Sequence, residues 1–199
     1  MTMGQLKRAR STEAKEARRV AILRVARDLF DEHPFDAISM AEVATKSRLA
    51  KGTVFLYFST KEALFFELLD ALLGEWLGMV HELVAQDDKP WPSARLARVL
   101  TETLADRPAL ERLLPMSATV LEPNVPAPRL AEFRHKLLRR YFSTGALIEQ
   151  RLGLAHAGDG VTLLTFANAM IVGLCTGNDT DLRTALTVLF NGFHRKGGG

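Results

Sequence analysis

The stretch from Ser39 to Lys61 constrains the fold of this chain more than any other part of its sequence. Its pattern predicts a short helix, a tight turn, a second short helix and the start of a third. Ser39 precedes Glu42 by three residues, the spacing of a capping box at the start of a helix. Val54 and Phe58 lie four residues apart and predict a buried face on the second helix. Two short helices joined by a turn form a unit that suits the major groove of DNA.

The other faces of the second helix carry groups that can contact DNA. Lys51 supplies a positive charge for phosphates, and the hydroxyls of Thr53 and Tyr57 can donate hydrogen bonds to phosphate oxygens. Phe55 and Leu56 can contact thymine methyl groups. The competing interpretation is that the aromatic residues belong to a core. We assign Phe58 to the core, and Phe55 and Tyr57 to the DNA face.

The run KGTVFLYF at residues 51–58, followed by KEAL at 61–64, resembles the DNA-binding signature of the TetR family of bacterial transcriptional regulators. The resemblance covers roughly residues 21–69. It implies an all-α protein with an N-terminal helix-turn-helix domain of three helices (1–60) and a C-terminal helical domain for dimerisation and ligand binding (61–199). Carried over by position, the resemblance implies base contacts from Ala41, Lys51, Gly52, Phe55 and Leu56, and phosphate contacts from Ser39, Thr53, Tyr57 and Lys61.

Three positions depart from the family pattern. Arg48 stands in the turn where many members have glycine, which tolerates a positive φ. Arg48 therefore either alters the turn or adds a basic contact to DNA, and we include it among the DNA-binding residues. Ala50 stands where a capping serine is frequent, which predicts a weaker start to the second helix. Phe55 replaces a more usual tyrosine and removes one hydroxyl from the DNA face.

The distribution of charge supports a DNA-binding half. Residues 1–61 contain 12 Lys and Arg against 7 Asp and Glu, a net charge of +5. Residues 62–199 contain 14 against 16, a net charge of −2. Positive charge is therefore concentrated around the groove-reading motif, as expected of a protein whose N-terminal half binds nucleic acid.

Other classes of protein find little support. No segment approaches the ~20 apolar residues of a membrane helix, and the single cysteine, Cys175, fits a packed residue in a reducing cytoplasm. The five histidines have no metal-ligand spacing, and there is no nucleophile motif or phosphate-cradling glycine loop. We therefore expect a cytoplasmic protein that is not an enzyme, with no metal or cofactor, whose partners are double-stranded DNA and a second copy of itself.

Breaks in the apolar periodicity locate the remaining elements. Residues 1–15 are polar and predict a flexible arm that either lies along DNA or has no defined structure, and the glycine-rich C-terminal tail predicts disorder. The basic residues after Pro128 predict a solvated helix face. We expect helices at about 13–32, 60–85 with Ser59 in its cap, 93–106 capped by Ser93, 108–121 broken at Pro115, 129–152, 161–176 and 181–193, with loops at 86–92, 122–128 and 153–160.

Two sets of apolar residues predict sites in the C-terminal half. The first lines a pocket for a small apolar ligand, although each member also fits an ordinary core. It consists of Trp76, Met79, Trp91, Met116, Phe142, Phe166, Asn168 and Met170. The second forms an isologous dimer interface, or alternatively an internal helix pair. It consists of Leu164, Ile171, Val172, Leu182, Leu186, Leu189 and Phe193.

The sequence thus predicts a repressor that binds a palindromic operator as a homodimer and is released by a small apolar ligand. A second hypothesis keeps the DNA-binding domain but makes the C-terminal domain a protein-interaction module without an inducer. A closed apolar cavity favours the first hypothesis, and a solid core with an exposed apolar patch favours the second.

Overall fold

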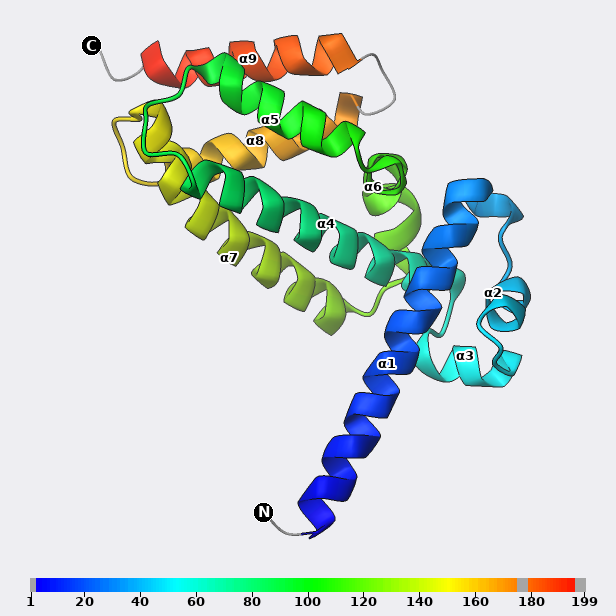
Figure 1. The fold of residues 1–199 in the computed structure, drawn as a ribbon. Helices are drawn as coiled ribbons and strands as arrows, with labels where there is room; N and C mark the ends of the chain where they lie inside the picture. The colour runs from blue at the N-terminus through cyan, green and yellow to red at the C-terminus, as the bar shows by residue number, and fades with distance from the viewer. Residues whose placement is uncertain (1–2, 175–178, 196–199) are drawn as a thin grey trace. The chain divides into compact units, whose positions relative to one another are not determined.

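The computed structural model describes residues 3–174 and 179–195, and this part of the chain is helical with no β-strand (Figure 1). The all-α prediction is therefore confirmed. The chain divides into two compact units between Leu68 and Leu69, inside helix α4 (Lys61–Ala85). The sequence prediction placed a domain boundary after residue 60. Cys175 and the C-terminal tail lie outside the described residues.

The N-terminal unit contains α1 (Met3–Glu32), a 3-10 turn η1 (Phe35–Ala37), α2 (Met40–Lys46), α3 (Lys51–Tyr57) and the first two turns of α4. The rings of Phe30 and Phe35 meet the ring of Phe65 edge-on, with centroids 5.3 and 5.1 Å apart. This aromatic centre holds α1 and the η1 connection against α4. The unit's fully or nearly fully buried apolar residues include Ile22, Ala26, Leu29, Phe30, Ile38, Val43, Val54, Phe58 and Phe65.

Helix α1 begins ten residues before the position expected from the sequence. The prediction of a flexible arm over residues 1–15 is wrong for residues 3–15, where the backbone is helical. Residues such as Ala, Arg, Lys, Glu and Gln dominate this segment, and all of them favour helix without forming an apolar stripe. The absence of an apolar period therefore did not indicate the absence of a helix. Its C-terminal end at Glu32, just before Pro34, agrees with the prediction.

Two predicted helix caps are wrong by one residue. The hydroxyl oxygen of Thr60, rather than Ser59, accepts a 3.0 Å hydrogen bond from the Ala63 amide at the start of α4. Pro92 is the N-cap of α5 (Ser93–Ala105), so Ser93 is the first helical residue. Its buried hydroxyl has no hydrogen-bond partner within the described structure. Ser59 and Ser93 each satisfy the spacing rule for a cap, but the path of the chain places the adjacent residue at the cap position.

The C-terminal unit is completed by α5, α6 (Pro108–Leu113), α7 (Ala127–Leu152), α8 (Asp159–Leu174) and α9 (Asp179–Arg195). Helix α8 packs against α7 and α9, and α9 also packs against α5 (Figure 1). The expected break at Pro115 is present, because α6 ends at Leu113 and short 3-10 and π turns continue to Asn124. The loop expected over residues 122–128 is shorter, since a 3-10 turn and the start of α7 occupy most of it.

Glycines permit a close contact between α7 and the start of α8. A Cβ atom on Gly160 would lie 2.1 Å from the carbonyl oxygen of Gly145, so only glycine fits there. The Glu149 carboxylate accepts hydrogen bonds of 2.9 Å from the amides of Gly158 and Gly160. Glu149 therefore satisfies amides that the first turn of α8 leaves without helical partners.

The basic residues of α7 do not all form a solvated face. Arg129, Lys136 and Arg140 turn toward Asp70, a buried carboxylate on α4. The sequence could not show this, because Asp70 is more than 50 residues away from them in the chain. The prediction holds for Arg134, His135 and Arg139, whose side chains are exposed.

Candidate nucleic-acid interface and ligand cavity

Helix α2 begins where the Ser39–Glu42 spacing predicts, with one of the two hydrogen bonds of a capping box. The Ser39 hydroxyl oxygen accepts a 3.2 Å hydrogen bond from the Glu42 amide, which satisfies one of the free amides of the first turn. The inward residues Met40, Val43 and Ala44 are buried. Helix α2 is therefore fixed by a cap at one end and an apolar stripe along its length.

The turn after α2 is closed by two backbone hydrogen bonds and a left-handed residue. The Leu49 amide donates to the Ala44 carbonyl at 2.9 Å, and the Arg48 amide donates to the Thr45 carbonyl at 3.0 Å. This pair of bonds is a Schellman motif, which requires a left-handed residue just past the helix end. Arg48 takes that place with a φ of 56°. Arginine thus occupies a conformation that glycine adopts more easily, and its side chain is exposed.

Helix α3 separates buried residues from outward ones. Val54 and Phe58 are buried, whereas Phe55 is 40% exposed and Leu56 is 84% exposed. The Lys51 ammonium lies 5.9 Å from the centre of the Phe55 ring. The N-cap residue Ala50 makes no side-chain capping bond, as expected. The outward face of α3 is therefore apolar and basic. The buried side chains of Val54 and Phe58 hold the opposite face of this short helix in the core.

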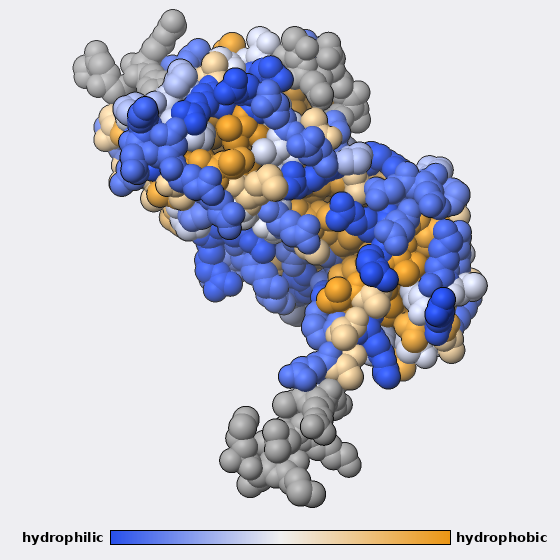
Figure 2. Space-filling view, viewed as in Figure 1, coloured by the Kyte–Doolittle hydropathy of each residue, from blue (hydrophilic) through white to orange (hydrophobic). Residues whose placement is uncertain are grey.

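The structure brings the predicted DNA-contacting residues onto α2, the turn and α3, with Lys61 at the start of α4. No side chain lies within 4 Å of where a Cβ of Gly52 would stand, so the surface there is open. Figure 2 shows apolar side chains among hydrophilic ones at the protein surface. The exposed members of the set are Ser39, Ala41, Arg48, Lys51, Gly52, Phe55 and Leu56, and the partly buried ones are Thr53, Tyr57 and Lys61.

Lys61 has an intramolecular role that the sequence did not indicate. Its ammonium donates a 3.0 Å hydrogen bond to the Phe35 carbonyl and lies 4.1 Å from the centre of the Phe35 ring. Lys61 therefore ties the η1 turn to the start of α4. A phosphate contact from this side chain would have to share or break these interactions.

Arg19 is a second residue whose structural role the sequence did not indicate. Its guanidinium forms an ion pair with Glu67 on α4 and lies 5.8 Å from the Phe58 ring centre, at the C-terminal end of α3. Arg19 therefore links α1, α3 and α4. No sequence signal could have selected it, because its partners lie 39 and 48 positions further along the chain.

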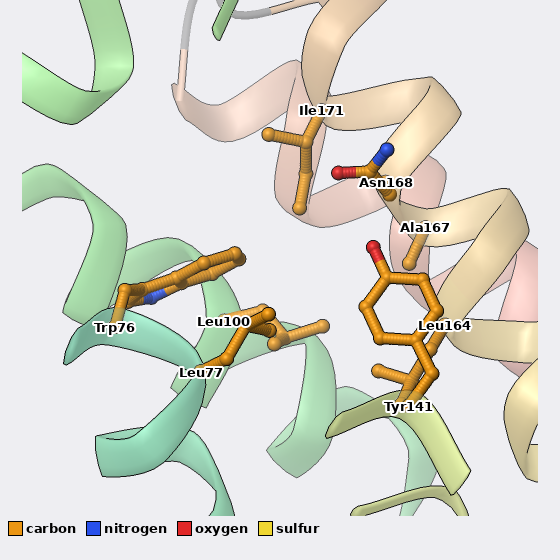
Figure 3. A pocket seen from close by; sticks show the side chains of 8 residues that line it. All are labelled: Trp76, Leu77, Leu100, Tyr141, Leu164, Ala167, Asn168 and Ile171. Atoms are coloured by element: carbon orange, nitrogen blue, oxygen red, sulfur yellow. The ribbon is translucent and has the colours of Figure 1, made fainter. Parts of the chain in front are cut away.

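The C-terminal unit contains a small, partly open apolar cavity between four helices. Its lining comes from α4, α5, α7 and α8, and the Tyr141 hydroxyl and Asn168 amide end on the same side of it (Figure 3). Burial raises the pKa of the Tyr141 phenol above its usual value. The cavity volume is only about 10 Å³, close to the space of one water molecule. It is lined by Trp76, Leu77, Leu100, Tyr141, Leu164, Ala167, Asn168 and Ile171.

Only part of the predicted pocket set reaches this cavity. Trp76 and Asn168 line it, and the Trp76 indole donates a 2.8 Å hydrogen bond to the Thr103 hydroxyl. Trp91 is buried in a different place, where its indole donates to the Asp87 carboxylate. The members of the set outside the lining are Met79, Trp91, Met116, Phe142, Phe166 and Met170.

The predicted dimer residues are mostly turned into their own protomer. Leu164, Ile171, Leu182 and Leu186 are buried, and Val172, Leu189 and Phe193 are partly exposed. A side chain buried within one protomer has little surface left for a second, so the four buried residues are better described as core. The helical spacing of apolar residues identified the apolar stripe on each helix. It did not show whether that stripe faces the core of its own protomer or a second copy. The large apolar residues exposed on α8 and α9 are Phe166, Leu174 and Val188.

Metal and membrane sites find no support in the described residues. Within residues 3–174 and 179–195, no three His, Cys, Asp or Glu side chains gather in a way that would hold a metal ion. None of the helices seen there is both long and apolar enough to cross a membrane.

Two family models match the chain and together cover most of it. The model described as bacterial regulatory proteins of the tetR family matches residues 22–68. The model described as a tetracyclin repressor-like C-terminal domain matches residues 70–185.

Individual relatives agree with these matches. The helix-turn-helix transcriptional regulator YfiR of Bacillus subtilis is 32% identical over 130 residues, 65% of this chain and 60% of its own length. A helix-turn-helix transcriptional repressor of Mycobacterium tuberculosis is 29% identical over 75% of this chain and 73% of its own. Among solved structures, Thermus thermophilus FadR in complex with lauroyl-CoA superposes with a TM-score of 0.56 and 26% identity, covering 89% of this chain and 91% of FadR.

Proposed function

Since the chain belongs to the TetR family of bacterial regulatory proteins, we propose that it represses transcription as a homodimer on a palindromic operator and that a small apolar ligand releases it. The family matches and the relatives are DNA-binding transcriptional regulators rather than enzymes. The repressor role takes further support from the M. tuberculosis relative, whose name describes a repressor.

The outward face of α3 is the observation that carries the DNA-binding part of the proposal. Leu56 is a large apolar side chain that is 84% exposed on a helix whose opposite face is fully packed. Such exposure on an anchored helix is expected where a partner surface covers the side chain. In the major groove, Leu56 and Phe55 would meet thymine methyl groups while Lys51 approaches phosphates.

Two copies are needed because a helix of seven residues reads few base pairs. We propose that the exposed apolar residues of α8 and α9 form the dimer interface. Phe166 is 50% exposed and Val188 is 67% exposed. Replacing Val188 by Glu would then shift the protein toward monomer in sedimentation experiments. Val20→Glu, the same change at an exposed valine of α1, is the matched control and should leave the association state unchanged.

The proposed apolar ligand would bind in the cavity that Tyr141 and Asn168 help to line. Support comes from FadR, a similar protein whose bound lauroyl-CoA carries an apolar acyl chain next to its charged CoA part. Ligand sites usually occupy about 300–1,000 Å³, far more than the present cavity, so binding would have to separate the helices that line it. Such a ligand would bind only the form in which these helices are separated. It would weaken DNA binding only if the protein on its operator disfavours that form.

The protein-interaction module remains a second candidate because of the same cavity. A volume of about 10 Å³ is nearly a solid core, and α7 exposes Phe142 and Leu138 on its surface. An exposed apolar patch over a solid core is what an interaction surface requires. This candidate predicts that no apolar compound changes operator affinity, whereas a protein partner protects Phe142 from solvent.

The deciding experiment is selection of bound duplexes from a random DNA pool at two salt concentrations. We expect a palindromic consensus at both concentrations, with affinity falling as salt rises because phosphates contribute to binding. Recovery of no consensus at either concentration would contradict operator recognition. The selected duplex then serves as the probe for a screen of fatty acyl and other apolar compounds, in which loss of DNA binding identifies an inducer.

A further inference from the structure

Three cations on α7 lie around one buried carboxylate of α4, and a fourth, Arg139, is exposed on the same helix. The Asp70 carboxylate receives the Arg129 guanidinium at 2.5 Å, with Arg140 at 3.7 Å and Lys136 at 3.9 Å. Arg139 is exposed on the same helix and forms no ion pair with any described residue. The positive charges around Asp70 therefore outnumber the single negative charge of its carboxylate.

The position of Arg140 depends on a glycine of α4. A Cβ atom at Gly74 would lie 2.6 Å from Nη2 of Arg140, so the guanidinium rests on a part of α4 that has no side chain. Its Nη1 atom is buried and donates no hydrogen bond to the described residues. The Arg140 guanidinium is therefore held in place by packing and charge, and only its remaining exposed part can face a ligand.

Lys136, Arg139 and Arg140 border a wide, shallow surface cleft of about 390 Å³ that is largely open to solvent. Its lining consists of Lys136, Arg139, Arg140 and Ser143. An open, charged surface of this kind suits a strongly charged ligand, which keeps part of its hydration, rather than an apolar one. Residues 136–143 span only about 10 Å of helix, which suits one compact anion better than an extended polymer.

Neighbouring carboxylates do not neutralise the cleft. The cations that line it are Lys136, Arg139 and Arg140. Glu132 lies 2.7 Å from Lys136, and Asp70, near Lys136 and Arg140, is also paired with Arg129 at 2.5 Å. The three lining cations therefore carry more charge than these two carboxylates balance. Paired guanidinium groups bind phosphate oxygens through charge-assisted hydrogen bonds, and a lysine adds a further donor.

We propose that this cleft is a binding site for a small phosphate-bearing molecule, such as a diphosphate ester. Lys136, Arg139 and Arg140 would contact the phosphate oxygens, and Asp70 would hold Arg140 and Lys136 in position. The site lies in the C-terminal unit and is distinct from both the α3 surface and the apolar cavity. It does not depend on the proposed repressor function.

Isothermal titration of the full-length protein with inorganic pyrophosphate tests this site at constant ionic strength. The double variant Lys136→Gln, Arg139→Gln leaves the Arg129–Asp70 pair in place and should weaken pyrophosphate binding by about tenfold or more. Arg98→Gln removes an exposed cation from α5, outside the cleft, and is the control that should leave the affinity unchanged. Circular dichroism confirms that each variant is folded.

Three outcomes would overturn the proposal. The first is no pyrophosphate binding by the wild type, and the second is equal weakening by Arg98→Gln, which would mean diffuse attraction to net charge. The third comes from a parallel titration with duplex DNA of random sequence. If the double variant lost affinity for DNA but kept its affinity for pyrophosphate, the cleft would be part of the DNA contact rather than a small-molecule site.

Discussion

Replacing Arg48 by glycine should stabilise the protein, although it removes a side chain from the proposed DNA surface. Arg48 has a φ of 56°, the left-handed position that the Schellman motif after α2 requires. For a residue with a Cβ atom, this conformation costs about 1–2 kcal/mol. Glycine removes that strain but adds about 0.4–1 kcal/mol of conformational entropy to the unfolded chain. With the middle of each range, the expected net gain in unfolding free energy is about 0.8 kcal/mol.

The matched control is Arg48→Ala, which removes the same guanidinium but keeps the Cβ atom and the strain. We expect its unfolding free energy to stay within about 0.5 kcal/mol of the wild type. Urea denaturation of the three proteins separates the effect of the backbone from that of the charge. In thermal melts the glycine variant should gain roughly 1–4 °C. A glycine variant no more stable than the alanine variant would refute the strain argument.

Three further predictions concern single side chains. Leu56→Ala should change unfolding free energy by less than about 0.5 kcal/mol yet alter the selected DNA sequence, whereas Val54→Ala on the buried face should lose about 1–3 kcal/mol in the same denaturation assay. Lys61→Met should lose about 1–2 kcal/mol because its bond to the Phe35 carbonyl and its contact with the ring disappear, and unchanged stability would leave Lys61 a DNA role alone. Burial raises the pKa of Tyr141 above its usual 10.0, so its neutral form contributes stability that is complete below pH 10 and declines as the pH rises beyond it; a Tyr141→Phe variant followed by alkaline denaturation should decline less steeply.

The elements that local sequence signals predicted are present in the structure. The Ser39–Glu42 cap, the buried Val54–Phe58 face and the break at Pro115 each depend on residues within about one helical turn. The departure from glycine at Arg48 was another local signal, because the turn itself requires the positive φ that Arg48 adopts. The missed caps at Thr60 and Pro92 involve a choice between adjacent residues, which the local pattern leaves open.

The sequence by itself determined the helical class of this protein, the helix-turn-helix and the outward face of α3, because helix periodicity and capping act between near neighbours. Only the tertiary structure decided which long-range partners meet. It turned Leu182 and Leu186 into the core, narrowed the cavity beside Tyr141 to about 10 Å³, and brought three α7 cations to Asp70. A helix with apolar residues on more than one face does not specify which face meets its neighbour, and an ion pair across 59 residues leaves no periodic trace. Those contacts are selected by the joint packing of all the helices.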